Sequence, residues 1–248
     1  MPEYVWGRNP VLETLRSPRQ VKRILLAEGQ RGSPAVAAIV REAEQRHIPI
    51  ETTARHRLDQ ISQGAVHQGC IALVGARRYA DLDDILAYAQ QRQEDLFLLI
   101  LDTIQDVNNL GSLLRSAEAA GVHGVVIPQH EAAEVNATVV KTSAGAIEHL
   151  LIARETNLTR VIESLKKQNI WVIGLAGEAD TFYNQADLTG PLALVVGNEG
   201  KGISRLVREH CDLLIKLPMY GVINSLNAAV AGSIALYEAL RQRESKRI

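Results

Sequence analysis

The last two thirds of the chain alternate short apolar runs with stretches of helical apolar spacing. The run at 96–101 contains no polar residue, and shorter apolar runs follow at 125–127, 150–152, 171–173, 192–196 and 213–215. Helical spacing fills the gaps at 110–120, 135–143, 157–168, 203–209 and 226–243. Strands without a polar face are typical of sheets covered on both sides, and regular alternation favours parallel strands. The sequence therefore predicts an α/β fold with a parallel sheet and helices on both faces.

The first 75 or so residues have the pattern of a smaller α/β unit. Strand-like segments lie at 21–27, 48–51 and 67–74, with helical spacing at 35–45 and a turn of helix at 58–61. Residues 76–95 differ, because Arg77-Arg78 is followed by a series of acidic residues and a short helical stretch at 85–89. We therefore predict a domain at 1–76, a linker at 77–95 and a larger domain at 96–248.

Charge is distributed unevenly along a chain whose net charge is -1. Residues 1–79 carry a net charge of +5 and residues 80–248 a net charge of −6, and eleven of the twelve N-terminal cations are arginine. Arginine binds phosphate in a bidentate manner and stacks on bases, so the first segment favours nucleic-acid contact. An ordinary solvated surface explains the charge equally well. Only 4% of residues are aromatic, which argues against a base-stacking platform.

Several classes of protein lose support from the sequence. The first residues lack the basic and apolar regions of a secretory signal, and no apolar run reaches the ~18–20 residues of a membrane helix. Cys70 and Cys211 are far apart, so we expect no disulfide framework and no zinc site, and a cytoplasmic location fits. The seven histidines form no metal-ligand pattern, and the glycine fingerprints of dinucleotide and P-loop sites are missing.

Polar loops follow three of the predicted strands. Asn109 precedes a predicted helix ended by Gly121, and helix capping alone would explain this asparagine. Gly111 costs about 1 kcal/mol relative to alanine, which hints at close approach by another group. Arg115 lies on the same helix, and taken alone it fits an ordinary surface arginine.

The second and third loops are richer in glycine and asparagine. Gly197-Asn198-Glu199-Gly200-Lys201-Gly202 has three glycines in six residues, which suits backbone amides close to a ligand, although a flexible turn fits as well. The third loop contains Leu217-Pro218-Met219 and Ser225-Leu226-Asn227, where Ser225 could simply cap the last helix. Three such loops after strands of one sheet favour a shared ligand site.

In this order the three loops resemble the motifs of the SpoU family of RNA ribose 2′-O-methyltransferases, within the SPOUT superfamily. The resemblance rests on Asn109-x5-Arg115, Gly197-x-Glu199-Gly200-x-Gly202 and Leu217-Pro218-Met219-x-Gly221-x3-Ser225-Leu226-Asn227, and it covers about 96–243. Segments 6–11 and 67–69 also resemble the family's small RNA substrate-binding domain. The chain departs from the family where Val107 replaces a frequent proline, and where Tyr220 and Ala228 stand in the last motif.

The resemblance implies a fold and a set of partners. The catalytic domain would end in a deep trefoil knot, an exception to normal connectivity, and the N-terminal domain would be L30e-like. The methyl donor would be S-adenosylmethionine, with no metal. The enzyme would be a homodimer that acts on rRNA, with no DNA or membrane partner. The residues implied to hold the donor are Gly197, Asn198, Gly200, Leu217, Met219, Ser225 and Leu226.

The implied reaction moves a methyl group to the ribose 2′-hydroxyl of a guanosine in 23S rRNA. The implied catalytic residues are Arg115, Asn109, Glu199, Ser225 and Asn227. Because a neutral guanidine is scarce at pH 7, we expect Arg115 to grip a phosphate and stabilise the developing alkoxide rather than to act as a base. The alternatives are 2′-O-methylation of a tRNA ribose and a non-catalytic RNA-binding protein.

Overall fold

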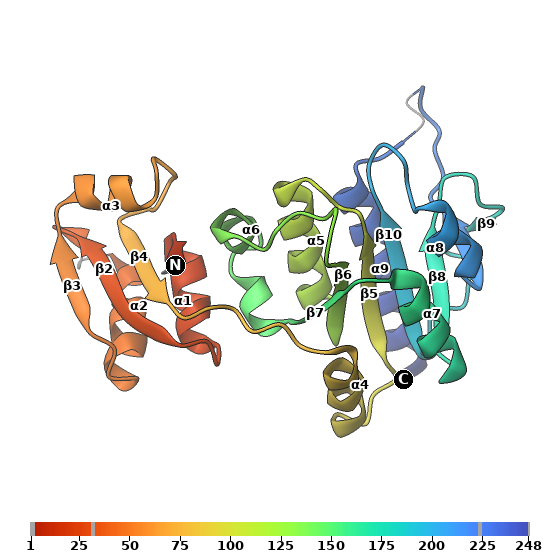
Figure 1. Ribbon diagram of the computed structural model, residues 1–248, viewed down its shortest axis with the longest axis horizontal. Coiled ribbons are helices and arrows are strands. Elements are labelled where there is room, and N and C mark those ends of the chain that lie inside the picture. The colour runs from red at the N-terminus through yellow and green to blue at the C-terminus, as the bar shows by residue number, and fades with distance from the viewer. Residues whose placement is uncertain (1–2, 31–32, 223–224, 248) are drawn as a thin grey trace. The chain divides into compact units, whose positions relative to one another are not determined.

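The computed structural model describes residues 3–30, 33–222 and 225–247, and it divides into two compact units (Figure 1). Unit 1 comprises Met1–Arg78 and Val135–His149, and unit 2 comprises Tyr79–Glu134 and Leu150–Ile248. The chain thus leaves unit 2 after Glu134 and returns to it at Leu150. The stretch predicted as a linker contains helix α4 (Leu82–Gln91), whose Ile85 is fully buried in unit 2.

Unit 1 is built on a mixed four-stranded sheet in the order β1-β4-β2-β3. Strand β4 is antiparallel to both β1 and β2, and β2 is parallel to β3. The strands are β1 (Glu3–Trp6), β2 (Val21–Ala27), β3 (Ile50–Thr53) and β4 (Cys70–Val74). The helices are α1 (Arg8–Arg16), α2 (Pro34–Gln45), α3 (Arg55–Ile61), α6 (Ala137–Thr142) and the 3₁₀ turn η2 (Ala146–His149).

The returning segment of unit 1 is held by ion pairs as well as by packing. The carboxylate of Glu148 is almost completely buried and accepts hydrogen bonds from Arg19 at 3.0 Å and Arg77 at 2.5 Å. His149 contacts Glu13 of α1 through Nε2 at 2.9 Å. A buried carboxylate is stable only when it is paired and hydrogen-bonded, so these two arginines fix η2 against the start of the chain.

Unit 2 contains a seven-stranded sheet in the order β7-β6-β5-β10-β8-β11-β9, with every pair of neighbours parallel (Figure 1). The strands are β5 (Phe97–Asp102), β6 (Gly124–Pro128), β7 (Leu151–Glu155), β8 (Trp171–Leu175), β9 (Thr181–Phe182), β10 (Leu192–Gly197) and β11 (Leu213–Lys216). The remaining helices are α5 (Val107–Ala119), α7 (Leu158–Lys167), α8 (Arg205–His210) and α9 (Ala228–Arg247).

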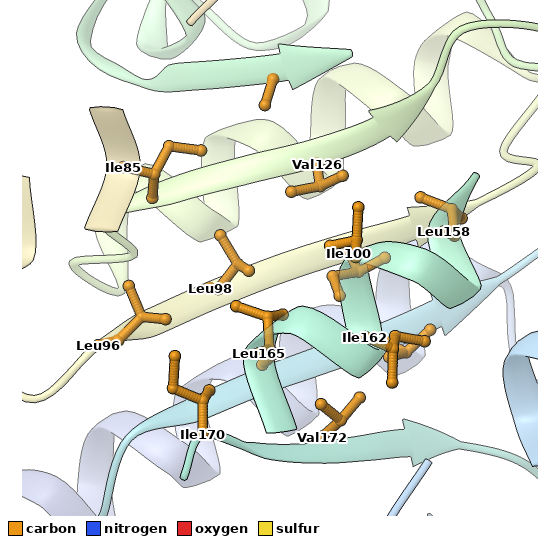
Figure 2. Close-up of a cluster of buried hydrophobic side chains, with 14 of the residues drawn as sticks. Ile85, Leu96, Leu98, Ile100, Val126, Leu158, Ile162, Leu165, Ile170 and Val172 are labelled. Carbon is orange, nitrogen blue, oxygen red and sulfur yellow. The ribbon is translucent and has the colours of Figure 1, made fainter. Parts of the chain in front are cut away.

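Helices cover both faces of this sheet. On one face α4 and α7 bury Ile85 and Leu165 against strand residues that include Leu98 and Ile100 (Figure 2). Val207 of α8 belongs to the same buried cluster. On the other face α5 packs against α9, and a Cβ at Gly232 of α9 would lie 2.6 Å from Leu113 and 3.2 Å from Val196. Burial of a large aliphatic side chain contributes about 1.5–3 kcal/mol, so this two-faced core dominates the stability of unit 2.

The predicted α/β fold with a parallel sheet and a smaller N-terminal unit is confirmed. Four elements were not predicted, namely β1, α1, η2 and the two-residue strand β9. The knot stays a prediction, and so do the domain boundaries at 76 and 95. No helix in the described part of the chain is both long and apolar enough to cross a membrane.

Candidate active site

A pocket of about 330 Å³ lies where β8, β10 and β11 end, at the carboxyl edge of the sheet. This is the edge at which open parallel sheets bind ligands. Its wall is formed by three loops and by the start of α9. The lining residues are Leu175, Ala176, Gly177, Glu178, Val196, Gly197, Asn198, Glu199, Gly200, Lys201, Gly202, Lys216, Leu217, Met219, Ser225, Leu226, Ala228 and Ala231. All seven residues predicted to hold the donor are among them.

The loop after β10 is closed on itself by its own backbone. Asn198 N–H donates to the Gly202 carbonyl at 3.0 Å, and Gly202 N–H donates back to the Asn198 carbonyl at 2.8 Å. A Cβ at Gly197 would lie 2.2 Å from the backbone of Gly202, closer than any side chain allows. Glycine at 197 is therefore required by this close approach.

The Asp102 side chain at the end of β5 and the backbone of Thr103 hydrogen-bond to this loop. Asp102 is buried, and its Oδ2 accepts the Ser204 N–H at 2.6 Å. Asn198 Nδ2 donates to the Thr103 carbonyl at 3.1 Å, while its Oδ1 accepts the Gly200 N–H at 2.9 Å. Thr103 itself has a φ of 58°, a left-handed conformation that is unusual for a β-branched residue.

Asn109, Glu199 and Asn227 form a chain of side-chain hydrogen bonds across all three loops. Asn227 Nδ2 donates to Asn109 Oδ1 at 2.8 Å, and Asn109 Nδ2 donates to Glu199 Oε1. Asn227 Oδ1 also accepts the N–H groups of Ala229 at 2.9 Å and Val230 at 3.2 Å. We call these three residues the polar triad. It joins Asn109 to Glu199, which is 90 positions later, and to Asn227, which is 118 positions later.

Two capping alternatives from the sequence are wrong. Helix α5 begins at Val107, three residues before the predicted start, and its N-cap is Asp106, which accepts the N–H groups of Asn108 and Asn109. Asn109 is therefore inside the first turn, and its amide is left for the polar triad. The first turn of α9 is capped by Asn227 rather than by Ser225. The predicted end of α5 holds, since Gly121 has a φ of 73°.

Among the described residues, neither Arg115 nor Ser225 is hydrogen-bonded to the polar triad. Arg115 is exposed on α5 on the same helical face as Asn108 and Ser112, and it makes no ion pair with any described residue. Ser225 is exposed and lines the pocket. The catalytic roles predicted for these two residues stay predictions.

Some residues of the site were missed by the sequence analysis. Asp102 had a usable signal, because an acidic residue directly after a fully apolar strand lies at the ligand edge of the sheet. Gly177 and Glu178 had the same signal after β8. Thr103 had none, because nothing in the sequence indicates a left-handed threonine.

Neither cysteine lines the pocket. Burial raises the pKa of both Cys70 and Cys211 to about 12, so neither thiol forms a nucleophilic thiolate near neutral pH. Within residues 3–30, 33–222 and 225–247, no group of three or more His, Cys, Asp or Glu side chains is arranged to hold a metal ion. The pocket thus offers backbone donors, the Asn198 amide, apolar contacts and the charged side chains of Glu178, Glu199, Lys201 and Lys216 to a small organic molecule.

Two family models match the chain. The SpoU rRNA Methylase family matches residues 96–237, which contain the pocket and the polar triad. The chain belongs to this family. A second model, for RNA 2′-O ribose methyltransferase substrate binding, matches residues 4–80 of this SpoU methylase.

Named relatives cover nearly the whole SpoU chain. It is 44% identical over 247 residues to the Escherichia coli 23S rRNA (guanosine-2′-O-)-methyltransferase RlmB, covering 98% of this chain and 100% of RlmB. It is 46% identical over 241 residues to Bacillus subtilis YacO, described provisionally as a TrmH family tRNA/rRNA methyltransferase. The match covers 97% of this chain and 96% of YacO. The solved structure of the SpoU methyltransferase AviRb from Streptomyces viridochromogenes with AdoMet has a TM-score of 0.82 at 28% identity. The match covers 98% of this chain and 90% of the AviRb chain.

Proposed function

We propose that this enzyme transfers a methyl group from S-adenosylmethionine to the ribose 2′-hydroxyl of a guanosine in 23S rRNA. The observation that carries the proposal is the end-to-end similarity to RlmB, combined with a polar triad that joins all three family motifs beside one pocket. Fold similarity alone would not indicate the reaction, because function depends on the site.

The pocket fits the donor. Its volume of about 330 Å³ lies within the range of small-molecule sites. Leu217, Met219 and Leu226 supply apolar contacts for a base and a methylene chain, and the backbone around Gly197 allows close approach. When bound, the donor supplies a methyl group on a sulfonium, which is a strong electrophile. The enzyme therefore has mainly to align the hydroxyl, whose proton passes to solvent water as the O–CH3 bond forms and the S–CH3 bond of the donor breaks.

The polar triad positions the ends of the three motif loops. Glu199 is held by Asn109, and Asn109 is held by Asn227, whose other amide atom caps α9. A shift of any one loop would break these hydrogen bonds, so the triad keeps the pocket and the adjacent ribose site in register. Preorganisation of this kind avoids reordering of the site during the reaction.

Arg115 is proposed to bind a phosphate next to the reacting ribose and to stabilise the alkoxide that forms at the 2′-oxygen. Its exposure and its lack of an ion pair with any described residue leave the guanidinium available to RNA. A guanidinium stays charged at neutral pH, which suits charge stabilisation better than proton abstraction. Ser225 is proposed to orient the ribose from the pocket rim.

Residues 1–76 are proposed to be the domain that binds the RNA substrate, and residues 96–248 the domain that catalyses methyl transfer. Residues 77–95 are proposed to link these two domains. The net charge of +5 on residues 1–79 and the match of residues 4–80 to the substrate-binding model support this division. An rRNA substrate would place the enzyme in the cytoplasm.

The enzyme is proposed to be a homodimer that pairs through α9. Val230, Ile234 and Tyr237 lie on one face of this helix and are 49%, 38% and 50% exposed. An apolar stripe of this kind on a long helix is typical of a helix that packs against a partner. Ser233 of α9 hydrogen-bonds to Ser116 of α5 at 2.7 Å, so the catalytic helix would lie close to the interface.

The homodimer is tested by Ile234→Glu. A charge at the centre of an apolar interface is expected to give a monomer in analytical ultracentrifugation. Leu206→Glu on α8 is the matched control, because Leu206 is 53% exposed outside the stripe. A monomeric wild type, or equal effects of both variants, would contradict the proposal.

We also infer that the C-terminal segment threads the deep trefoil knot of the family. Support comes from the strand order, in which β10 inserts between β5 and β8, and from the return of α9 against α5 beside the same pocket. Slow refolding that speeds up in a circular permutant opened in the loop before β10 would support the knot, and identical refolding rates would count against it.

The reaction is tested by methyl transfer from labelled S-adenosylmethionine to unmodified transcripts of 23S rRNA and of tRNAs. A single 2′-O-methylguanosine in 23S rRNA is the expected result. Arg115→Ala should lower turnover by about 100-fold or more while leaving donor binding nearly unchanged, and Arg115→Lys should restore part of the loss. Near-normal turnover of Arg115→Ala would remove the role assigned to this residue.

A tRNA ribose is the second candidate substrate, because the YacO description names both tRNA and rRNA. Methyl transfer to tRNA and not to 23S rRNA would keep the chemistry and replace the substrate. Donor binding without transfer to either RNA would instead favour a non-catalytic RNA-binding role.

A further inference from the structure

Left-handed backbone at non-glycine residues identifies two constrained places in the molecule. Eight described residues have this conformation, and five of them directly follow a helix C-cap, where it is common: His47, Gln63, Gln93, Ala144 and Asn169. Of the other three, Thr103 lies at the active site and Glu131 in an exposed turn, which leaves Gln68 in unit 1. Strain of this kind persists only where the surroundings enforce it, and it clusters at functional sites.

The turn that contains Gln68 is held from three sides. Cys70 N–H donates to the His67 carbonyl at 3.0 Å, and both Gln68 and Gly69 are left-handed, with φ of 54° and 77°. The buried His67 accepts the Gly69 N–H through Nδ1 at 3.0 Å and contacts Asp59 through Nε2 at 2.8 Å. A Cβ at Gly69 would lie 2.9 Å from the side chain of Gln30. The turn is therefore fixed before any ligand binds.

Arg8, the first residue of α1, is clamped by this turn. Its backbone N–H donates to Gln68 Oε1 at 2.9 Å, its Nε donates to the Gln68 carbonyl at 3.2 Å, and its Nη2 donates to Gln30 Oε1 at 2.8 Å. A long side chain normally loses much conformational entropy when it binds a ligand. The half-buried guanidinium of Arg8 is already ordered by its hydrogen bonds in the free protein, so ligand binding causes little further loss of side-chain entropy.

These residues line an open pocket of about 520 Å³. Arg55, the first residue of α3, also lines it, as do Asp59 and residues 64–68. Arg55 is exposed and has no ion-pair partner among the described residues. Two guanidinium groups and two amides thus line a space that has no Phe, Tyr or Trp among its lining residues.

We propose that this pocket binds one unpaired nucleotide of the RNA substrate. Arg8 and Arg55 would hold its phosphate, and the amides of Gln68 and Gln30 would hydrogen-bond to the edge of its base. Guanidinium groups match phosphate geometry, and side-chain amides read base edges that only unpaired RNA exposes. The inference rests on the proposed function and adds to it the place in unit 1 where the RNA is recognised.

The first test compares two arginines of the same short helix. Arg55 lines the pocket, whereas Arg57 donates to Glu51 at 2.9 Å and does not line it. In filter binding to an unmodified Escherichia coli 23S rRNA transcript, Arg55→Gln should raise Kd about 10-fold and reduce the slope of log K against log salt by about 1. Arg57→Gln removes the same charge and should change Kd less than about twofold.

The second test compares two left-handed glutamines. Gln68→Gly and Gln63→Gly both relieve left-handed strain, and only the former removes a pocket side chain. Gln68→Gly should raise Kd about 10-fold with an unchanged salt slope, since an amide contacts no phosphate charge. Gln63→Gly should bind as wild type, and both melting temperatures should stay within about 4 °C of wild type.

The measured pattern separates this inference from the proposed function. Wild-type methyl transfer to the same transcript, measured alongside, tests the reaction itself. Wild-type Kd for both Arg55→Gln and Gln68→Gly, with transfer intact, overturns the pocket and leaves the enzyme assignment standing. Equal losses in the Arg55 and Arg57 variants would show a diffuse charge effect and would also overturn it. A wild type that neither binds nor methylates the transcript overturns both.

Discussion

The pocket of unit 2 and the pocket of unit 1 are constructed from different materials. The first is shaped mainly by backbone, with Gly197 pressed against Gly202 and the loop closed by reciprocal N–H to carbonyl hydrogen bonds. The second is shaped by long side chains, with Arg8 clamped between Gln30 and Gln68. A backbone site should fail when atoms are added to it, and a side-chain site should fail when atoms are removed.

The largest effect is expected from Gly197→Ala. The added methyl group would lie 2.2 Å from the Gly202 backbone, so the loop must open, and overpacking of this kind costs about 1–3 kcal/mol or more. We expect donor binding, measured by calorimetry, to weaken by more than about 100-fold as the wall of the pocket moves.

Gly200→Ala is the matched control in the same loop. Its Cβ would have one neighbour, Asn198 Oδ1 at 3.5 Å, which is an ordinary van der Waals contact. Because Gly200 itself lines the pocket, donor affinity should fall, but by less than about 10-fold, well short of the loss expected for Gly197→Ala. If both alanine variants lose donor binding equally, the loop is sensitive to any substitution and the contrast between backbone and side-chain sites does not hold.

Most of the fold of unit 2 could be predicted because its central strands are apolar on both faces and five of the seven strands are followed along the chain by a helix. The elements that were missed have weak local signals. Helix α1 contains Pro10, which is tolerated because the first turn has no acceptor for its missing N–H. Strand β1 pairs with β4 about 67 residues away, and β9 has only two residues at a sheet edge. Their structure depends on contacts distant in sequence.

The site was predictable to the extent that it is made of backbone. Glycine clusters after apolar strands located the loops around Gly197 and Leu217, and both line one pocket. The partners within the polar triad were not predictable, because Asn109 and Glu199 are 90 residues apart and an asparagine near a helix start usually caps it. Arg8 and Gln68 of the unit 1 pocket lie in the segments 6–11 and 67–69 that resemble the family's substrate-binding domain, but nothing in the sequence indicated that they hydrogen-bond to each other across 60 positions.

An intermediate effect is expected from Asn227, the one residue that serves both as a helix cap and in the polar triad. Asn227→Asp keeps an oxygen for the N–H groups of Ala229 and Val230 but has no N–H to donate to Asn109. Stability should stay within about 0.5 kcal/mol of wild type, and turnover should fall about 10-fold or more as the loops lose register.

Asn227→Ala distinguishes the two roles. It removes both the cap and the amide donor, so it should lose about 1 kcal/mol of stability, measured by urea unfolding, in addition to the same loss of turnover. A fully active Asn227→Asp enzyme would show that the triad is only structural, and the side chains of the backbone-built site would then matter less than proposed.

The smallest effect concerns a histidine arrangement that both units share. His123 in unit 2 accepts the Phe97 N–H through Nδ1 at 2.9 Å and contacts Glu94 through Nε2 at 2.9 Å, as His67 does with Gly69 and Asp59 in unit 1. Burial lowers the pKa of His123 below its ordinary value of 6.5, against the opposing influence of Glu94. The folded protein therefore favours the neutral ring, whose Nδ1 lone pair holds the start of β5.

The sign of the pH effect follows from proton binding. Below pH 6.5 the unfolded chain protonates this histidine while the folded protein resists, so the unfolded state binds more protons and stability falls as the pH is lowered towards the folded pKa. His123→Gln keeps an acceptor for the Phe97 N–H and cannot titrate. Its melting temperature should therefore fall less than that of wild type between pH 7.5 and 5.5, with donor and RNA binding at pH 7.5 unchanged. If the melting temperatures of the two proteins fall equally between pH 7.5 and 5.5, the neutral ring does not contribute to the folding of β5.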